Sequence, residues 1–510
     1  MGVWRKMSTL LAGSIFIHSN NIACKDMATE IKGLRPEAVW SFFYDLTQIP
    51  RPTGQMEEVV AYVLGVGERL GLETRKDEVG NVLIRKPASP GMEGKPVVAL
   101  QAHLDMVPQK NSDVQHDFGK DPIDAWVDGE WVRARGTTLG ADNGIGAAMA
   151  LAVLADGTLK HGPIEALFTI DEEVGMVGAF GLKEGFCRAD YLLNLDSESV
   201  DELYIGCAGG VDINVTLEYQ EEEPNEDDVP VEVQLSGLRG GHSGMDIVLG
   251  RGNANKMMFR FLKKARMEMD LSLVSVHGGS LRNAIPREAT AVVMVPSADL
   301  SQFKNLVHDY QGLYIEEYAG VEEGIQLSAR ELSEKPQRVV PEEVADNVIQ
   351  AIEACQNGAI TYLADFPGTV ESSSNMAAVH LGEGKLQVTF LVRSSSESRK
   401  DMVASSIESV FALIGARVEL QAPYNGWQPD AHSHILEVMK RVMKETIGAE
   451  PPIKVIHAGL ECGILQGAMP GTQMISFGPT IVGPHSPAEK VNIKSVEKTW
   501  HYLIRTLAEI

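Results

Sequence analysis

Residues 96–105 read Pro-Val-Val-Ala-Leu-Gln-Ala-His-Leu-Asp, an apolar run that ends in a histidine and an aspartate. Apolar runs of this length, bounded by polar residues, predict buried strands of a parallel sheet. Ligands of an open α/β sheet bind outside the carboxyl ends of its strands, so we expect clusters in this position to converge. Two later runs end in acidic residues in the same way: 164–170 before Glu172 and Glu173, and 191–195 before Asp196.

Two further residues with metal-binding side chains fit the same site. Asp142 stands where a Gly-rich loop meets the helical stretch 144–155, at the position of an N-cap. His485 lies in Gly-Pro-His-Ser-Pro, just past the apolar strand pattern 474–477. Two histidines and several carboxylates in one crevice suit a borderline cation such as zinc. The sequence therefore predicts a two-metal hydrolase.

Neighbouring residues in these clusters suggest a division of roles. His103 and Asp105 face the same side of a strand, because positions i and i+2 project together. A metal-bound imidazole is commonly oriented by a carboxylate, which is the role we expect for Asp105. Glu172 and Glu173 are adjacent and point to different places, which suits one ligand and one base. Pairs such as His-x-Asp or Glu-Glu also occur on ordinary protein surfaces. The prediction therefore depends on finding all the clusters together, in this order along the chain.

Composition limits what the chain can be. A length of 510 residues exceeds one hydrophobic core, so we expect two domains. Hydrophobic residues at 44% and charged residues at 23% are typical of a soluble globular protein. The formal charge of −25 disfavours nucleic acid as a partner, because phosphate binding needs clustered lysine and arginine. Five scattered cysteines without a CxxC pattern favour a reducing compartment.

The N-terminus allows two interpretations. Arg5 and Lys6 precede an apolar segment at residues 10–17, which resembles a short signal or lipoprotein leader. The segment is brief, and residues 18–21 are polar where a cleavage region is small or apolar. Met27 opens a cytosolic start, so we expect a cytoplasmic protein, with export through the leader as the alternative. No other segment reaches the length of a transmembrane helix, so we expect no membrane partner unless the leader is real.

The hydrophobic periodicity changes twice along the chain. Helical and strand patterns alternate up to about residue 210, as in an α/β layer fold. Strand patterns then occur together with long helical patterns, as in an α+β fold. Within this part, the acidic stretch 218–228 predicts a solvated hairpin loop. After residue 429 the pattern is α/β again. We predict an N-terminal leader or disordered extension at 1–33, a discontinuous α/β catalytic domain at 34–210 and 425–510, and an inserted α+β lid domain at 211–424.

Several motifs occur in the order found in one enzyme family. Ala-His-Leu-Asp-Met-Val, Leu-Gly-Ala-Asp-Asn-Gly-Ile-Gly, Asp-Glu-Glu-Val-Gly-Met and Gly-Pro-His-Ser-Pro resemble the metal motifs of the M20 metallopeptidases. The similarity is closest to the bacterial aminoacyl-histidine dipeptidases (Xaa-His dipeptidase, carnosinase, peptidase D), and it runs from about residue 35 to the C-terminus. The resemblance implies a zinc-exopeptidase-like catalytic domain. Other motifs that contribute to it lie at residues 240–244, 282–288, 426–429 and 457–463.

The resemblance implies roles for the clustered residues. Two zinc ions, with cobalt or manganese as substitutes, would be bridged by Asp142. Asp105 would orient an imidazole, and Glu172 would be the general base. Two zinc ions can lower the pKa of a bridging water from about 16 to about 7, and a base can pass its proton to the leaving amine. The implied metal ligands are His103, Asp142, Glu173, Asp196 and His485.

The resemblance also implies roles within the lid. His242 would donate a hydrogen bond to the tetrahedral oxyanion. Arg393 would hold the C-terminal carboxylate of a dipeptide through its bidentate fork, and Asn283 would assist. In dimeric relatives with a smaller lid, the partner chain delivers the histidine. Residues 211–424 suffice for two four-stranded, two-helix units, so we expect delivery within one chain. A cis peptide bond after Asp142 is implied as well.

Three hypotheses about function follow. The first is a dizinc dipeptidase that cleaves Xaa-His and other dipeptides, in a chain that could form a homodimer. The second is an N-acyl amino-acid deacylase with the same metal centre. The third is a non-catalytic metal-binding relative, which an intact Glu172 disfavours. HExxH, Gly-x-Ser-x-Gly and Walker motifs are missing from the sequence, so other catalytic templates find no support.

Overall fold

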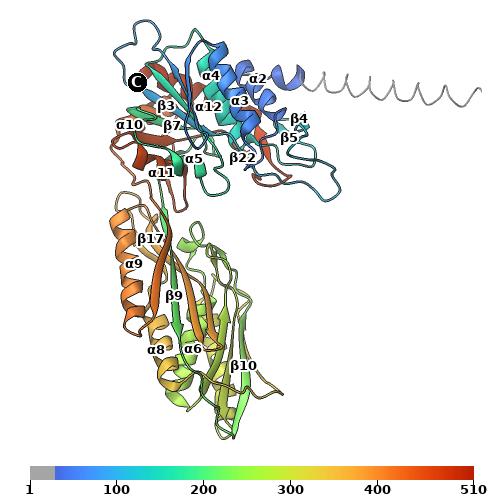
Figure 1. The fold of residues 1–510 in the computed structure, drawn as a ribbon, viewed down its shortest axis with the longest axis vertical. Coiled ribbons are helices and arrows are strands. Elements are labelled where there is room, and N and C mark those ends of the chain that lie inside the picture. Colours follow the sequence, from blue (N-terminus) through green and yellow to red (C-terminus); the bar gives the residue numbers. More distant parts are fainter. Residues whose placement is uncertain (1–28) are drawn as a thin grey trace, which may run out of the picture. The chain divides into compact units, whose positions relative to one another are not determined.

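The computed structural model describes residues 29–510. Residues 1–28 of the predicted N-terminal leader or extension lie outside the described residues. The chain divides into two compact units (Figure 1). Ile31, in the range assigned to the N-terminal extension, is fully buried. Among the described residues, unit 1 comprises 29–205, 430–454 and 464–510, and unit 2 comprises 206–429 and 455–463. Unit 2 thus takes up a segment, 455–463, that the sequence analysis placed in the catalytic domain.

Unit 1 is built on a mixed eight-stranded sheet with the order β1-β2-β6-β3-β7-β21-β8-β20. The predicted strands 96–100, 164–170 and 191–195 are confirmed as β3, β6 and β7. The pairs β3–β6, β3–β7 and β7–β21 are parallel, so the carboxyl ends of these four strands lie at one edge. The strands are β1 (Glu73–Lys76), β2 (Val82–Lys86), β3 (Val98–His103), β6 (Ile164–Thr169), β7 (Tyr191–Asn194), β8 (Leu203–Cys207), β20 (Ile453–Ile456) and β21 (Gln473–Ser476).

Helices bury the centre of this sheet. Every residue of β3 and of β6 is buried, as expected for strands covered on both faces. The helices are α2 (Glu37–Thr47), α3 (Glu57–Arg69), α4 (Ala141–Ala155), α5 (Val177–Gly181), α10 (His434–Ile447), α11 (Glu461–Ala468) and α12 (Ile493–Glu509). A smaller sheet of order β22-β23-β5-β4 joins the C-terminal segment to an early hairpin. Its strands are β4 (Ala125–Asp128), β5 (Trp131–Ala134), β22 (Ile481–Val482) and β23 (Lys490–Asn492).

Unit 2 contains one antiparallel sheet of nine strands, with the order β15-β10-β14-β12-β17-β18-β9-β19 and β16 beside β17. Its apolar face packs against four helices in a single core. The strands are β9 (Gly209–Glu218), β10 (Asp228–Ser236), β12 (Ser272–Gly278), β14 (Ala289–Pro296), β15 (Gln326–Glu331), β16 (Gly358–Tyr362), β17 (Val370–Gly382), β18 (Lys385–Ser394) and β19 (Arg417–Tyr424). The helices are α6 (Ala254–Glu268), α7 (Leu300–Glu317), α8 (Glu342–Ala354) and α9 (Glu397–Ala412).

The sheet of unit 2 consists of two similar halves. One half has the strands β15, β10, β14 and β12, and the other has β17, β18, β9 and β19. In chain order, α6 and α7 lie between strands of the first half, whereas α8 precedes β17 and α9 lies between β18 and β19 of the second. The halves join where His277 of β12 pairs with His380 of β17. The acidic connection 218–228 is not a hairpin loop, because four strands separate β9 from β10 in the sheet. Within residues 29–510, no helix combines the length and the apolar character needed to cross a membrane.

Candidate functional site

The residues expected to bind metal come together in unit 1, at the carboxyl edge of its parallel strands. His103 Nε2 lies 3.1 Å from Asp142 Oδ1 and 3.4 Å from Asp196 Oδ1. On the other oxygen of the same carboxylate, His485 Nε2 lies 3.2 Å from Asp142 Oδ2. His485 Nε2 is also 3.0 Å from Glu173 Oε2. The potential ligand atoms therefore form two groups of three that share Asp142.

Asp105 is fully buried and connects the first histidine to the two glutamates. Its Oδ1 lies 3.4 Å from His103 Nδ1 and accepts the backbone N–H of Glu172 at 3.0 Å. Its Oδ2 accepts the backbone N–H of Glu173 at 3.2 Å and the hydroxyl of Thr53 at 2.9 Å. Burial raises the pKa of Asp105, but the close contact with His103 and the hydrogen bonds from the two amides outweigh burial and lower it to about 2. The ionised carboxylate can therefore fix the position of all three neighbours.

The irregular first turn of α4 presents Asp142 to both groups. The Asp142–Asn143 peptide bond is cis, which confirms the expectation from the family resemblance. Both residues have non-helical backbone angles, so the regular helix begins after them. The prediction of Asp142 as the N-cap is wrong, because Asn143 Oδ1 accepts the backbone N–H of Gly146 at 3.1 Å. The cap falls on Asn143, and both oxygens of Asp142 remain directed at the histidines.

The crowding of carboxylates makes the site suitable for cations. Burial and the charges of Asp142 and Glu173 raise the pKa of Asp196 to about 6, against the effect of the nearby histidine. Burial and the charges of Asp142 and Asp196 raise the pKa of Glu198 to about 8. Hydrogen bonds to Asp142 and Glu173 raise the pKa of His485 to about 10. Glu173 Oε1 and Asp196 Oδ1 are buried without a hydrogen-bond partner in the described part of the chain. Imidazoles and spare carboxylate oxygens are a donor set that fits a divalent cation.

Glu172 lies beside this centre without being needed to complete either group around Asp142. It forms a third group of potential ligand atoms with His103 and Glu173. The sequence analysis missed two buried charged residues nearby, Arg51 and Glu489. The signals available were weak: an arginine between two prolines, and a glutamate four residues after His485.

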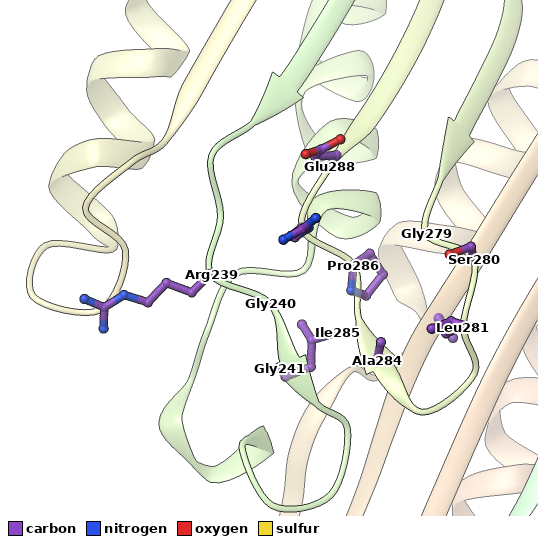
Figure 2. A pocket seen from close by; sticks show the side chains of 12 residues that line it. Arg239, Gly240, Gly241, Gly279, Ser280, Leu281, Ala284, Ile285, Pro286 and Glu288 are labelled. Atoms are coloured by element: carbon purple, nitrogen blue, oxygen red, sulfur yellow. The ribbon is translucent and has the colours of Figure 1, made fainter. Parts of the chain in front are cut away.

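The lid residues expected from the sequence lie in unit 2. His242 is in the short ribbon of β11 (Gly241–His242) and β13 (Ala284–Ile285). Gly241, Ala284 and Ile285 of this ribbon line a cavity (Figure 2). His242 Nδ1 accepts the backbone N–H groups of Gly244 and Met245, at 3.2 and 3.0 Å. The proton of the neutral ring is therefore on Nε2, which makes Nε2 a donor. Burial and the charge of Arg393 lower the pKa of His242, which favours this neutral form. Asn283 is exposed, and its carbonyl accepts the backbone N–H of Ser243 at 2.8 Å.

Arg393 is the next-to-last residue of β18, lies opposite Ser373 of β17 and is only 5% exposed. Its Nη1 donates to the hydroxyl of Tyr424 at 2.9 Å, and its Nε has no hydrogen-bond partner among residues 29–510. His457 lies near it and is hydrogen-bonded to the Ser373 hydroxyl at 2.7 Å. Burial, Arg393 and His242 lower the pKa of His457 to about 3, so this ring is neutral. The sequence analysis included His457 in a motif but gave it no role.

Comparisons with known proteins agree with this geometry. Residues 99–509 match peptidase family M20/M25/M40. The cytosol non-specific dipeptidase of Escherichia coli K12 is 44% identical over 482 residues, which cover 94% of this chain and 99% of that protein. The crystal structure of an aminoacylhistidine dipeptidase from Vibrio alginolyticus is 45% identical, with a TM-score of 0.91 over 94% of this chain and 98% of that chain.

A more distant structure shows the same fold. The aminopeptidase PepT from Bacillus cereus has 17% identity and a TM-score of 0.54, over 93% of this chain and 99% of that chain. The family match covers most of the chain, and the two similar dipeptidases align over nearly all of it. The chain therefore belongs to peptidase family M20/M25/M40, and it is a metallopeptidase.

Proposed function

We propose that this enzyme is a dipeptidase that hydrolyses Xaa-His and other dipeptides at a two-metal centre. The observation that carries the proposal is the pair of three-residue groups that share Asp142. The substrate class is supported by the names of the two similar proteins, a non-specific dipeptidase and an aminoacylhistidine dipeptidase. Identities of 44% and 45% over 94% of the chain support the same reaction here.

The proposed metals are two zinc ions, with cobalt or manganese as substitutes. His103, Asp142 and Asp196 would hold one ion, and Asp142, Glu173 and His485 would hold the other. When bound, the ions supply Lewis acidity and lower the pKa of a bound water. The chain supplies the ligand geometry, because the buried Asp105 orients His103.

Glu172 is the proposed general base. Asp105 accepts hydrogen bonds from the backbone N–H groups of both Glu172 and Glu173. The base is thereby fixed relative to the adjacent ligand, and a fixed position is what proton transfer requires. Glu172 takes a proton from the attacking water and returns it to the leaving amine.

Residues of unit 2 are proposed to bind the substrate. The neutral His242 carries its proton on Nε2 and can donate a hydrogen bond to the developing oxyanion. Arg393 is buried, and its Nε has no partner in the described part of the chain, so it can take a carboxylate in a bidentate pair. We propose that it holds the C-terminal carboxylate of the dipeptide, assisted by Asn283.

The test is a substrate panel on zinc-loaded and chelator-treated protein. We expect hydrolysis of β-alanyl-histidine and of other dipeptides, loss of activity after chelation, and recovery when zinc is added. N-acetyl amino acids should be poor substrates. Rapid deacetylation without dipeptide cleavage would instead make the chain an N-acyl amino-acid deacylase. Zinc analysis of the active protein should give two ions per chain.

We propose a cytoplasmic location, which the name of the Escherichia coli relative supports. The alternative is export through the leader at the N-terminus. Cell fractionation of the full-length protein decides between them. Activity in the cytoplasmic fraction is expected, whereas a processed protein in the membrane or secreted fraction would establish export.

A further inference from the structure

Glu489 makes four hydrogen bonds to the loop that carries Asp142. Its Oε2 accepts the backbone N–H groups of Leu139 and Gly140, at 2.7 and 2.9 Å. Its Oε1 accepts those of Ala141 and Asp142, at 2.7 and 3.2 Å. The carboxylate is only 2% exposed, so these amides replace the water it loses. Four consecutive amides use its acceptor capacity fully, and the loop is held at every residue up to Asp142.

Arg51 acts on the carbonyl side of the same loop. It is also 2% exposed, and its Nη1 donates to the carbonyls of Leu104 and Asp105, at 2.9 and 3.1 Å. Its Nη2 donates to the carbonyl of Gly140. A Cβ at position 144 would lie 2.6 Å from Nη2, so Gly144 leaves room for the guanidinium. One guanidinium thus joins the segment that follows β3 to the loop before α4.

The chain positions of these residues give the contacts a common consequence. Glu489 comes four residues after His485, whose Nε2 is 3.2 Å from Asp142 Oδ2. The same short segment therefore supplies an imidazole to the carboxylate of Asp142 and an acceptor to its amide. Arg51 holds the segment that carries the other histidine, because the carbonyls it binds belong to the two residues that follow His103.

We propose that Glu489 and Arg51 are positioning residues that set Asp142 between its two histidines, so that metal affinity depends on both. The proposal rests on the metal-ligand set of the proposed function. It predicts an effect on metal binding that an ordinary buried hydrogen-bonded residue does not have. Outer-shell partners of metal ligands typically change metal affinity by about 10- to 100-fold when they are replaced.

The test compares Glu489→Gln with a matched control, Glu322→Gln. Glu322 is a buried glutamate of unit 2, 4% exposed, that accepts the backbone N–H groups of Arg239 and Gly252, at 2.8 and 3.0 Å. The metal-free proteins are titrated with cobalt(II), and the visible absorption of the bound ion is recorded. Both variants should melt at a lower temperature than the wild type. Only Glu489→Gln should bind cobalt at least about tenfold more weakly, with an altered absorption spectrum.

A second variant covers a failure of Glu489→Gln to fold. Glu489→Asp keeps the charge but is one methylene shorter, so it cannot keep all four amide bonds. It should also bind cobalt more weakly and show an altered spectrum. Wild-type affinity and spectrum in whichever of the two variants folds would overturn the proposal and leave Glu489 a purely structural residue. If the wild type itself bound no cobalt, the metal-ligand set would be wrong, which is a separate failure.

Discussion

Glu172 and Glu173 follow β6 as neighbours, and their backbone amides are held by one carboxylate, yet their side chains have different surroundings. Glu173 Oε2 is 3.0 Å from His485, whereas Glu172 is not needed to complete either group around Asp142. We therefore expect Glu172→Ala to keep its metal and to lower turnover at least about 10²-fold, the low end for loss of a general base. Metal content and kcat measured on one preparation check this. Loss of metal with unchanged activity per bound ion would mean that the two roles are exchanged.

His457 gives the stability of the protein a dependence on pH. Its pKa is about 3 in the folded chain because of burial and the charges of Arg393 and His242, against about 6.5 for an unfolded histidine. Below pH 6.5 the unfolded state binds a proton that the folded state does not. The free energy of unfolding therefore falls as the pH is lowered from 6.5 toward 3, by at most about 1.4 kcal/mol per pH unit.

Replacing the ring tests this dependence. His457→Gln cannot take up the proton, so its urea midpoint should fall less between pH 7 and pH 5.5 than that of the wild type. Both proteins are saturated with metal, so that protonation of the metal ligands changes the stability of each by the same amount. Equal decreases in the two proteins would show that His457 does not control the acid sensitivity.

Single residues differ in how far the sequence could assign them. His103 and Asp196 could be assigned because each follows an apolar strand pattern, and strand ends at one sheet edge must converge. Glu489 and Arg51 could not, because their partners are backbone groups, which every residue has. The amides that Glu489 binds are about 350 positions away in the chain. Such pairing leaves no local pattern.

Regular elements were predicted best where one face is apolar over several turns. The apolar periodicity predicts helices at 254–267 and 300–317, and the structure has α6 at Ala254–Glu268 and α7 at Leu300–Glu317. β17 was missed because it contains Ser-Ser-Ser-Asn at residues 372–375, which is typical of a loop. Three of these four buried side chains have partners on other elements: Ser372 bonds to Ser394, Ser373 to His457, and Asn375 to the carbonyl of Ala284. A sequence does not show such partners.

Packing of α4 against the sheet gives a prediction about an element. A Cβ at Gly146 would lie 2.5 Å from the backbone oxygen of Leu195, the residue before Asp196. Because backbone cannot yield like a flexible side chain, Gly146→Ala should displace the helix and cost about 1–3 kcal/mol of stability. Urea unfolding measures this, with Gly157→Ala as the control, since nothing lies within 4 Å of a Cβ there. Equal stability of the two variants would contradict the tight contact.

At the scale of the whole molecule, the order of the metal-binding residue types along the chain predicted the domain organisation better than the strand patterns did. Residues with metal-binding side chains on both sides of a long α+β stretch predicted an insertion at 211–424, and unit 2 includes all of that stretch. The strand order inside it could not be predicted, because pairing between distant strands is not a local property. The wrong hairpin between β9 and β10 is an example. Likewise, 455–463 belongs to unit 2 through contacts such as that of His457 with Ser373, far away in sequence.

The doubled sheet of unit 2 bears on which chain supplies His242. Two four-stranded, two-helix halves lie in one continuous sheet of one chain. A lid of two such halves gives one chain enough structure to present its own histidine. We therefore predict that His242 serves the active site of its own chain, and that its replacement by alanine lowers kcat by about 10²–10³. His277→Ala, a change on the same unit at the junction of the halves, should leave kcat unaltered.

Mixing two inactive variants tests this prediction. His242→Ala protein and Glu172→Ala protein are combined under conditions that allow subunits to exchange, and exchange is verified with two affinity tags. If the histidine crossed between chains, half of the dimers would be mixed, and each would contain one complete site. Dipeptidase activity would then recover toward a quarter of the wild-type value, and the prediction would be wrong. Donation within one chain leaves each polypeptide with its own defect, so the mixture should stay as inactive as its two components.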